Sequence, residues 1–269
     1  MKEKILFITD LDGTLLDETY DYRPIEGFIQ ELKKYNVSVI FSSSKTKKEQ
    51  EYYREKLHLN EPFVVEIGSA IYIPKNYFSW RFPKDKTIGQ YEVIELGVSS
   101  KMLSMIIDDY EKVSNTKLKR FSRISPEEIS KITGLPQSMA KWAQEREYSE
   151  VIVRGFPEES EFIATMVHYL NLHVYKSSKL LNVIGNTDKG RALRVLESLY
   201  SYEYENIEII SAGDGESDIP MLLAADLGIF VSNGKEIPEI VQNENKIVVV
   251  RNRDDLMRFI IDYIKKRTD

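Results

Sequence analysis

The sequence predicts an α/β protein in which a doubly wound parallel sheet is interrupted by an inserted α+β unit. Near both ends of the chain, short apolar runs typical of strands buried on both faces alternate with helical patterns. In the middle, two strands joined as a hairpin break this alternation. The 269 residues suffice for two such units, since one domain commonly holds about 100–200 residues.

The N-terminal part alternates strands and helices. Apolar runs predict four short strands, at residues 5–8, 37–41, 63–65 and 70–73. Apolar side chains at helical spacing predict a helix over 25–35, and a polar helix is expected over 46–57. Residues 75–90 show no period and are expected to form a connection.

The middle of the chain has a different character. After a strand that begins at Tyr91, helices are expected at 99–113, 137–146 and 158–170, with an irregular loop between the first two. Further strands are expected at 151–153, 172–175 and 180–184. Lys176–Lys179 is a plausible hairpin turn between the last two strands.

The first pattern resumes after Gly185. Helices are expected at 188–200, at 220–224 and from residue 254, with strands at 207–211, 227–231 and 246–250. We therefore assign residues 1–85 and 186–269 to an α/β core domain and residues 86–185 to an inserted α+β domain.

Composition excludes several classes of site. Without cysteine, the chain has no disulfide, thiolate metal site or cysteine nucleophile, and its three scattered histidines argue against a histidine-rich zinc site. The net charge is −6 and no basic tract stands out, so we expect no nucleic-acid partner. No signal peptide and no apolar stretch of about 18 residues is present, so we expect a cytoplasmic protein without a membrane partner.

Two acidic side chains directly follow the first predicted strand. Asp10 and Asp12 lie two residues apart, so both can point into the crevice at the carboxyl end of the sheet, where α/β proteins bind ligands. An EF-hand loop is excluded because Gly13 is fourth rather than sixth in the motif. Two solvated loop aspartates are the other alternative, but the apolar strand before them and the Gly-Thr after them favour a site.

A second acidic pair follows the predicted strand at 207–211. Asp214 and Asp218 are four residues apart, so one helical turn can place them on the same side. Asp218 alone could simply complement a helix dipole. Together with the first pair, these residues offer several hard oxygens, which suit Mg²⁺ held by carboxylates and a substrate phosphate.

Two further motifs could contact a phosphate. Ser42–Thr46 open a helix after a buried strand, where hydroxyl and backbone N–H groups suit phosphate oxygens, although helix capping explains them equally well. Lys189 lies in the first turn of a predicted helix, where the dipole disfavours a cation. This position is a weak indication of function, since surface lysines are common.

Taken in order, these four motifs resemble those of the haloacid dehalogenase superfamily of Mg²⁺-dependent phosphatases and phosphotransferases. The insert between the Ser43 and Lys189 motifs is similar to the α/β cap of a sugar phosphatase subgroup, which implies a Rossmann-like core under a cap. Among the members of this subgroup, residues 43–46, 62–66 and 146–150 of the chain resemble the mannosyl-3-phosphoglycerate phosphatase group. Departures from the usual pattern occur at Ile67, Ser69, Ser177, Ser178 and Ser217.

The resemblance implies roles for individual residues. Asp10 would be the nucleophile, Asp12 the general acid and base, and Ser43 and Lys189 would bind the transferring oxygens. The Mg²⁺ ligands would be Asp10, the Asp12 carbonyl and Asp214, with Asp218 in support. The substrate-binding candidates are Ser44, Lys45, Thr46, Arg146, Glu147, Glu150, Arg154, Lys176 and Lys179.

These observations favour a phosphatase that acts on a small sugar phosphate, first of all mannosyl-3-phosphoglycerate, which it would convert to mannosylglycerate. Another sugar phosphatase remains open, acting on glucosyl-3-phosphoglycerate, sucrose phosphate or a hexose phosphate. A phosphotransferase similar to phosphomannomutase and a sugar-phosphate-binding protein with a relic site also remain open. We expect a monomer or a small homo-oligomer.

Overall fold

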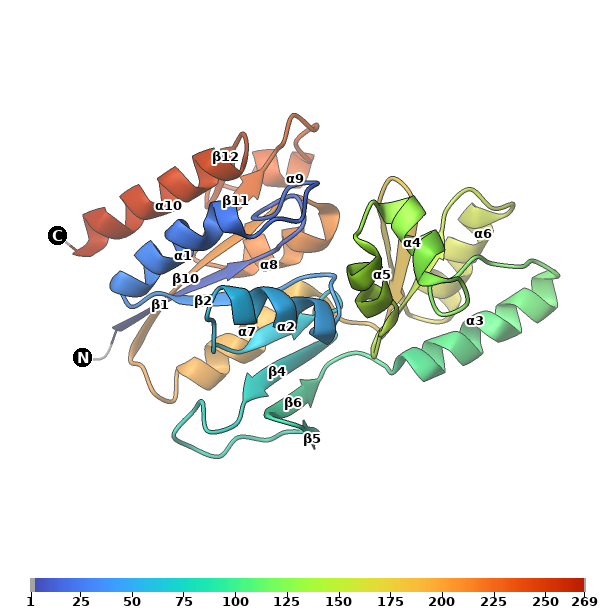
Figure 1. Ribbon diagram of the computed structural model, residues 1–269, viewed down its shortest axis with the longest axis horizontal. Coiled ribbons are helices and arrows are strands. Elements are labelled where there is room, and N and C mark those ends of the chain that lie inside the picture. The colour runs from blue at the N-terminus through green and yellow to red at the C-terminus, as the bar shows by residue number, and fades with distance from the viewer. Residues whose placement is uncertain (1–2, 269) are drawn as a thin grey trace.

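A five-stranded parallel sheet forms the centre of the part of the molecule that holds both chain ends (Figure 1). The computed structural model describes residues 3–268, so residues 1, 2 and 269 at the ends of the predicted core lie outside the description. The strand order is β12-β11-β10-β1-β2. The strands are β1 (Glu3–Thr9), β2 (Ser38–Phe41), β10 (Asn206–Gly213), β11 (Leu227–Val231) and β12 (Ile247–Val250).

Helices cover both faces of this sheet because its strands are apolar on both sides. Phe7 of β1 packs with α1 (Arg23–Lys34) and α10 (Arg253–Thr268) on one face. Its neighbours Leu6 and Ile8 pack with α7 (Lys189–Tyr200) and α8 (Ile219–Ala224) on the other. The doubly wound parallel sheet predicted from the sequence is confirmed.

A second sheet is antiparallel and has the strand order β3-β4-β6-β5. Its strands are β3 (Phe63–Val65), β4 (Ala70–Pro74), β5 (Lys86–Ile88) and β6 (Tyr91–Glu95). The expectation of a plain connection over 75–90 was wrong, because β5 is a short edge strand with half-exposed side chains and little apolar pattern. Since β5 and β6 belong to the sheet of β4, we propose that the insert starts after Glu95 rather than at residue 86.

The third sheet, β7-β9-β8, lies within the insert. Its strands are β7 (Ser149–Val153), β8 (His173–Lys176) and β9 (Leu180–Ile184). The accompanying helices are α3 (Ser100–Ser114), α4 (Pro126–Thr133), α5 (Gln137–Gln144) and α6 (Glu159–Ala164), which runs into a π-helical turn at Thr165–Tyr169. The irregular loop expected before α5 contains α4, although Ser125 at its N-cap and Gly134 at its C-cap were visible signals.

The insert meets the core where α5 packs against α2 (Lys47–Lys56), as Figure 1 shows. The remaining elements are a 3₁₀ turn at Glu216–Asp218, which contacts β8, and the short helix α9 (Glu239–Gln242). Across residues 3–268, every helix is too short or too polar to cross a membrane. This arrangement places the insert next to the carboxyl ends of β1 and β2.

Candidate active site

Three aspartates meet at the carboxyl ends of the two central strands. β1 and β10 pair in parallel with Thr9 opposite Ala212, so the residues that follow these strands lie side by side. One carboxylate oxygen from each of Asp10, Asp214 and Asp218 lies within 4.8 Å of the others. The two acidic motifs, almost 200 residues apart in sequence, therefore form one cluster.

Gly13 allows this close approach. Its φ is +80°, and a Cβ atom built there would lie only 2.3 Å from Oδ2 of Asp214. A side chain at this position would both strain the backbone and push Asp214 away. The glycine that follows the first acidic pair is thus explained by the packing of Asp214 against it.

Lys189 is the cation of the cluster. It is the first residue of α7, after the N-cap Asp188, and only 1% of its surface is exposed. Its Nζ atom donates to Oδ1 of Asp10 at 2.7 Å and also to Oδ1 of Asp218. Burial lowers the pKa of Lys189, but Asp10 and Asp218 more than offset this, so its pKa is raised and the amine stays charged.

The carboxylates are crowded. Burial raises the pKa of Asp10 to about 8, with Lys189 opposing and the other aspartates adding to the shift. Burial, followed by the charge of Asp218, also raises the pKa of Asp214. The lysines that contact these three carboxylates therefore do not offset the whole cost of their burial, and a bound metal cation would favour the ionised form.

The donor set fits a hard divalent cation such as Mg²⁺. Oδ2 of Asp218 already accepts the backbone N–H groups of Asp214 and Gly215, and its Oδ1 accepts from Lys189. Asp218 is therefore suited to a supporting role, and Asp10 and Asp214 each bring a carboxylate oxygen within 4.8 Å of it. The exposed Lys235 donates to Oδ2 of Asp214 from the loop after β11.

Asp12 lies at the edge of the same site and is held by Lys45. Nζ of Lys45 is 2.9 Å from Oδ2 of Asp12 and 3.6 Å from Glu49. Lys45 is buried, and the charges of Asp12 and Glu49 raise its pKa despite that burial. Oδ1 of Asp12 is buried and has no hydrogen-bond partner within residues 3–268, which leaves it available to a bound molecule.

A cavity of about 370 Å³ opens beside Asp12, between the core and the insert. Four of the substrate-binding candidates line it, namely Ser44, Lys45, Arg146 and Lys179. The other lining residues include Tyr20, Phe121, Leu135, Ser177, Ser178 and Asn182. Its volume lies within the range of about 300–1,000 Å³ that is usual for small-molecule sites.

The structure places the other candidates outside this cavity. Thr46 is a buried helix N-cap, and its hydroxyl accepts from Glu49 N in a capping box. Glu150 accepts hydrogen bonds from Ser122, and Arg154 pairs with Glu159. Glu147 accepts from Tyr72. These contacts hold the fold together, and the exposed Lys176 on β8 does not line the cavity either.

Several residues of the site carried no signal in the sequence. Tyr20, in the segment after Asp12, and Asn182, on β9 of the insert, both line the cavity. Tyr175 lies on β8, which contacts the turn at Glu216–Asp218; burial raises its pKa to about 12, and the charges of Asp188 and Glu216 add to this. No local pattern marks such residues, since only the placement of the insert brings them here.

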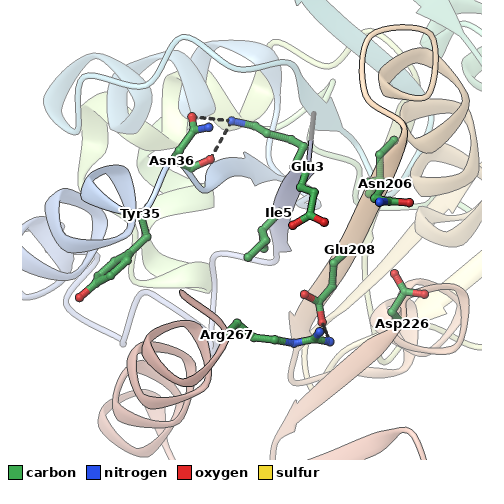
Figure 2. A pocket seen from close by; sticks show the side chains of 10 residues that line it. Glu3, Ile5, Tyr35, Asn36, Asn206, Glu208, Asp226 and Arg267 are labelled. Carbon is green, nitrogen blue, oxygen red and sulfur yellow. Dashed lines mark hydrogen bonds and ion pairs between the residues drawn. The ribbon is translucent and has the colours of Figure 1, made fainter. Parts of the chain in front are cut away.

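A larger hollow, of about 510 Å³, lies at the opposite, amino ends of the parallel strands (Figure 2). Its two cations already have partners: Lys4 donates to Asn36, and Arg267 pairs with Glu208. Glu3 and Asp226 also line it, but the carboxylate cluster is at the other end of the sheet. Because the carboxylate cluster lies at the other end of the sheet, we take the smaller cavity beside Asp12 as the candidate substrate site.

Comparison with known proteins agrees with this geometry. Residues 7–260 match the model of the haloacid dehalogenase-like hydrolase family. The chain is 40% identical to a mannosyl-3-phosphoglycerate phosphatase of Pyrococcus furiosus, over 86% of this chain and 91% of that protein. It is 35% identical to a glucosyl-3-phosphoglycerate/mannosyl-3-phosphoglycerate phosphatase of Methanococcoides burtonii, over 90% and 91% of the two chains.

Solved structures share the fold at lower sequence identity. A protein of Streptococcus mutans has a TM-score of 0.69 at 19% identity, covering 97% of this chain and 98% of its own. A sucrose-phosphatase of Synechocystis, solved with sucrose and phosphate, has a TM-score of 0.62 at 15% identity and covers 98% of each chain. At these identities the likeness shows the fold alone.

Proposed function

The chain belongs to the haloacid dehalogenase-like hydrolases, and we propose that it is an Mg²⁺-dependent phosphatase that hydrolyses mannosyl-3-phosphoglycerate to mannosylglycerate. The observation that carries the reaction type is the cluster of Asp10, Asp214 and Asp218 around Lys189. The substrate is proposed from the relatives that bear this name and from the cavity beside Asp12.

Asp10 is the nucleophile of this proposal. Its carboxylate oxygen attacks phosphorus, the bond from phosphorus to the sugar-glycerate oxygen breaks, and an aspartyl-phosphate forms. Lys189 contacts Asp10 directly and is positioned to offset the negative charge of the phosphoryl oxygens. The hydroxyl of Ser43, just after β2, would donate to the same oxygens, whereas the backbone N–H of Ser43 is already bonded to Val64 O.

Asp12 moves the protons. It donates a proton to the departing oxygen in the first step and takes one from water in the second, when phosphate leaves and Asp10 is regenerated. Lys45 fixes Oδ2 of Asp12, and we assign the proton transfers to Oδ1, which has no hydrogen-bond partner among residues 3–268. Asp10 and Asp214 would hold Mg²⁺ together with the Asp12 carbonyl, and the bound ion would neutralise charge on the phosphoryl group and keep Asp10 ionised.

The cavity supplies groups for the leaving part of the substrate. A sugar linked to phosphoglycerate carries a carboxylate and several hydroxyls. Lys45, Arg146 and Lys179 line the cavity and suit the carboxylate, while Tyr20 and Asn182 suit the hydroxyls. We therefore propose that these residues, rather than Glu150 or Arg154, recognise the leaving group.

The test is release of inorganic phosphate in the presence of Mg²⁺ from a panel of esters. The panel contains mannosyl-3-phosphoglycerate, glucosyl-3-phosphoglycerate, sucrose 6-phosphate and hexose phosphates. We expect the highest kcat/KM for the first, followed by its glucosyl analogue. A higher value for sucrose 6-phosphate or a hexose phosphate would refute the substrate, and a requirement for a bisphosphate activator would indicate a mutase.

A separate prediction concerns the cation. Because burial raises the pKa of Asp10 to about 8, this carboxyl is mainly protonated at pH 7 without metal. Binding of Mg²⁺ requires the ionised form, so we expect release of about one proton per site at pH 7. The release should diminish as the pH is raised above 8, and the bound ion should raise the melting temperature.

Isothermal titration in buffers of different ionisation enthalpy measures this proton release. Asp214→Asn should lose most of the Mg²⁺ affinity, whereas the matched variant Asp262→Asn, on the exposed side of α10, should bind like the unchanged protein. Equal Mg²⁺ affinity in the Asp214→Asn variant would show that the cation binds elsewhere.

A further inference from the structure

The turn between β3 and β4 has a strained backbone. Glu66, Ile67 and Gly68 have consecutive positive φ angles of 48°, 59° and 84°. Two of these residues carry side chains, and Ile67 is β-branched, so the conformation costs free energy. Such strain persists only where surrounding contacts fix the segment, and the contacts described below come from three other parts of the chain.

The carboxylate of Glu66 binds the insert. Its side chain is buried, with 1% of the residue exposed. Oε1 accepts the backbone N–H of Glu147 at 2.9 Å, and Oε2 accepts that of Tyr148 at 3.0 Å and the hydroxyl of Ser149. Three adjacent residues that lead into β7 therefore converge on one core carboxylate.

The same turn also touches the catalytic end of the core. The backbone N–H of Ile67 donates to Ser43 O at 3.0 Å. On the other side, a Cβ at Gly68 would lie 2.1 Å from Asp188 O and 2.7 Å from Lys189 N, so only glycine fits against the start of α7. The turn is therefore packed between the predicted phosphate-binding segment and Lys189.

Arg146 links this contact to the cavity. Nη1 of Arg146 donates to Ser149 Oγ at 2.8 Å and to Ser44 O at 3.2 Å, and Ser149 in turn donates to Glu66. Arg146 is also a lining residue of the cavity beside Asp12. Fixing residues 147–149 therefore fixes where this guanidinium lies relative to the leaving group.

We propose that Glu66 is a positioning residue: it docks the insert on the core and thereby places Arg146 over the leaving-group cavity. The proposal rests on the proposed phosphatase function for its effect on activity. Glu66 does not touch the reacting atoms, so it should govern selectivity for large leaving groups rather than phosphoryl transfer itself. A small aryl phosphate does not depend on Arg146 and should be hydrolysed independently of Glu66.

Glu66→Gln tests this, because it keeps the shape but loses the charge and one of the two acceptor oxygens. We expect kcat/KM for the sugar-phosphoglycerate to fall by about 10- to 100-fold, mainly through KM, as for loss of hydrogen bonds to a charged group. With 4-nitrophenyl phosphate, kcat/KM should stay within about twofold, since the transferring group and its ligands are untouched. Glu205→Gln, a matched change at an exposed site, should leave both values unaltered.

A second readout does not depend on activity. Hydrogen exchange should accelerate in peptides covering residues 145–150 of Glu66→Gln, but not in β10. Ser149→Ala, which retains the carboxylate and two of its three donors, should give a smaller effect of the same kind. If Glu66→Gln fails to fold, both the kinetic comparison and the hydrogen-exchange measurement are made on Ser149→Ala instead.

The possible outcomes separate the two proposals. An equal fall with both substrates, or no fall with either, would overturn the positioning role. If the unchanged protein hydrolyses no phosphate ester, the proposed function fails, and hydrogen exchange alone then tests whether Glu66 docks the insert on the core. Unaltered exchange over residues 145–150 in a folded variant would overturn that docking role.

Discussion

Replacing Asp10 with asparagine is expected to abolish turnover. An amide oxygen is a poor nucleophile, and asparagine also loses a proposed metal ligand, so kcat should fall by about 10⁴-fold or more, the scale seen when a nucleophile is removed. The fold should survive, because the change is nearly isosteric and the pKa of this buried carboxyl, about 8, shows that its charge is unfavourable there. Steady-state phosphate release and thermal melting measure the two effects.

Asp262→Asn is the control for this variant. It makes the same chemical change on an exposed face of α10 and should keep full activity. Turnover by Asp10→Asn at more than a trace of the unchanged rate, in a preparation free of deamidated protein, would rule out Asp10 as the nucleophile.

Lys189→Met is expected to have the second largest effect. The methionine side chain fills a similar volume but removes the only cation that contacts both Asp10 and Asp218 among residues 3–268. We expect kcat to fall by about 10²- to 10³-fold, as for loss of one preorganised group that stabilises developing charge. Measurement of kcat with saturating substrate and Mg²⁺ checks this.

The same variant should also change the pH dependence. Lys189 lowers the pKa of Asp10, so its removal raises that pKa and moves the acidic limb of kcat/KM to higher pH. Lys101→Met, on the exposed side of α3, should change neither kcat nor the pH at which kcat/KM falls on the acidic side. An acidic limb that stays fixed or moves to lower pH would contradict the assigned contact.

The parallel sheet could be predicted from the sequence because its strands are apolar on both faces, a pattern that few other structures produce. The clustering of Asp10, Asp214 and Asp218 could be predicted for the same reason, because each follows such a strand and parallel strands end at one edge. The elements that the sequence did not predict are short or half-exposed, such as β5 at Lys86–Ile88.

The wall of the cavity could not be predicted in the same way. Arg146 and Arg154 look alike in sequence, yet only Arg146 reaches the cavity, because Ser44 and Ser149 hold it there. Glu150 appeared suited to sugar hydroxyls, but Ser122 occupies its carboxylate. Such outcomes depend on how the insert docks on the core, which is a tertiary property that local patterns do not contain.

The central claim is that Asp10 carries the phosphoryl group, and trapping that intermediate tests it most directly. The protein is mixed with Mg²⁺ and substrate, quenched in acid within one turnover, treated with borohydride and digested for mass spectrometry. We expect reduction of residue 10 to homoserine in the peptide that follows β1, and none in Asp10→Asn. Homoserine at Asp12, Asp214 or another carboxylate would contradict the account.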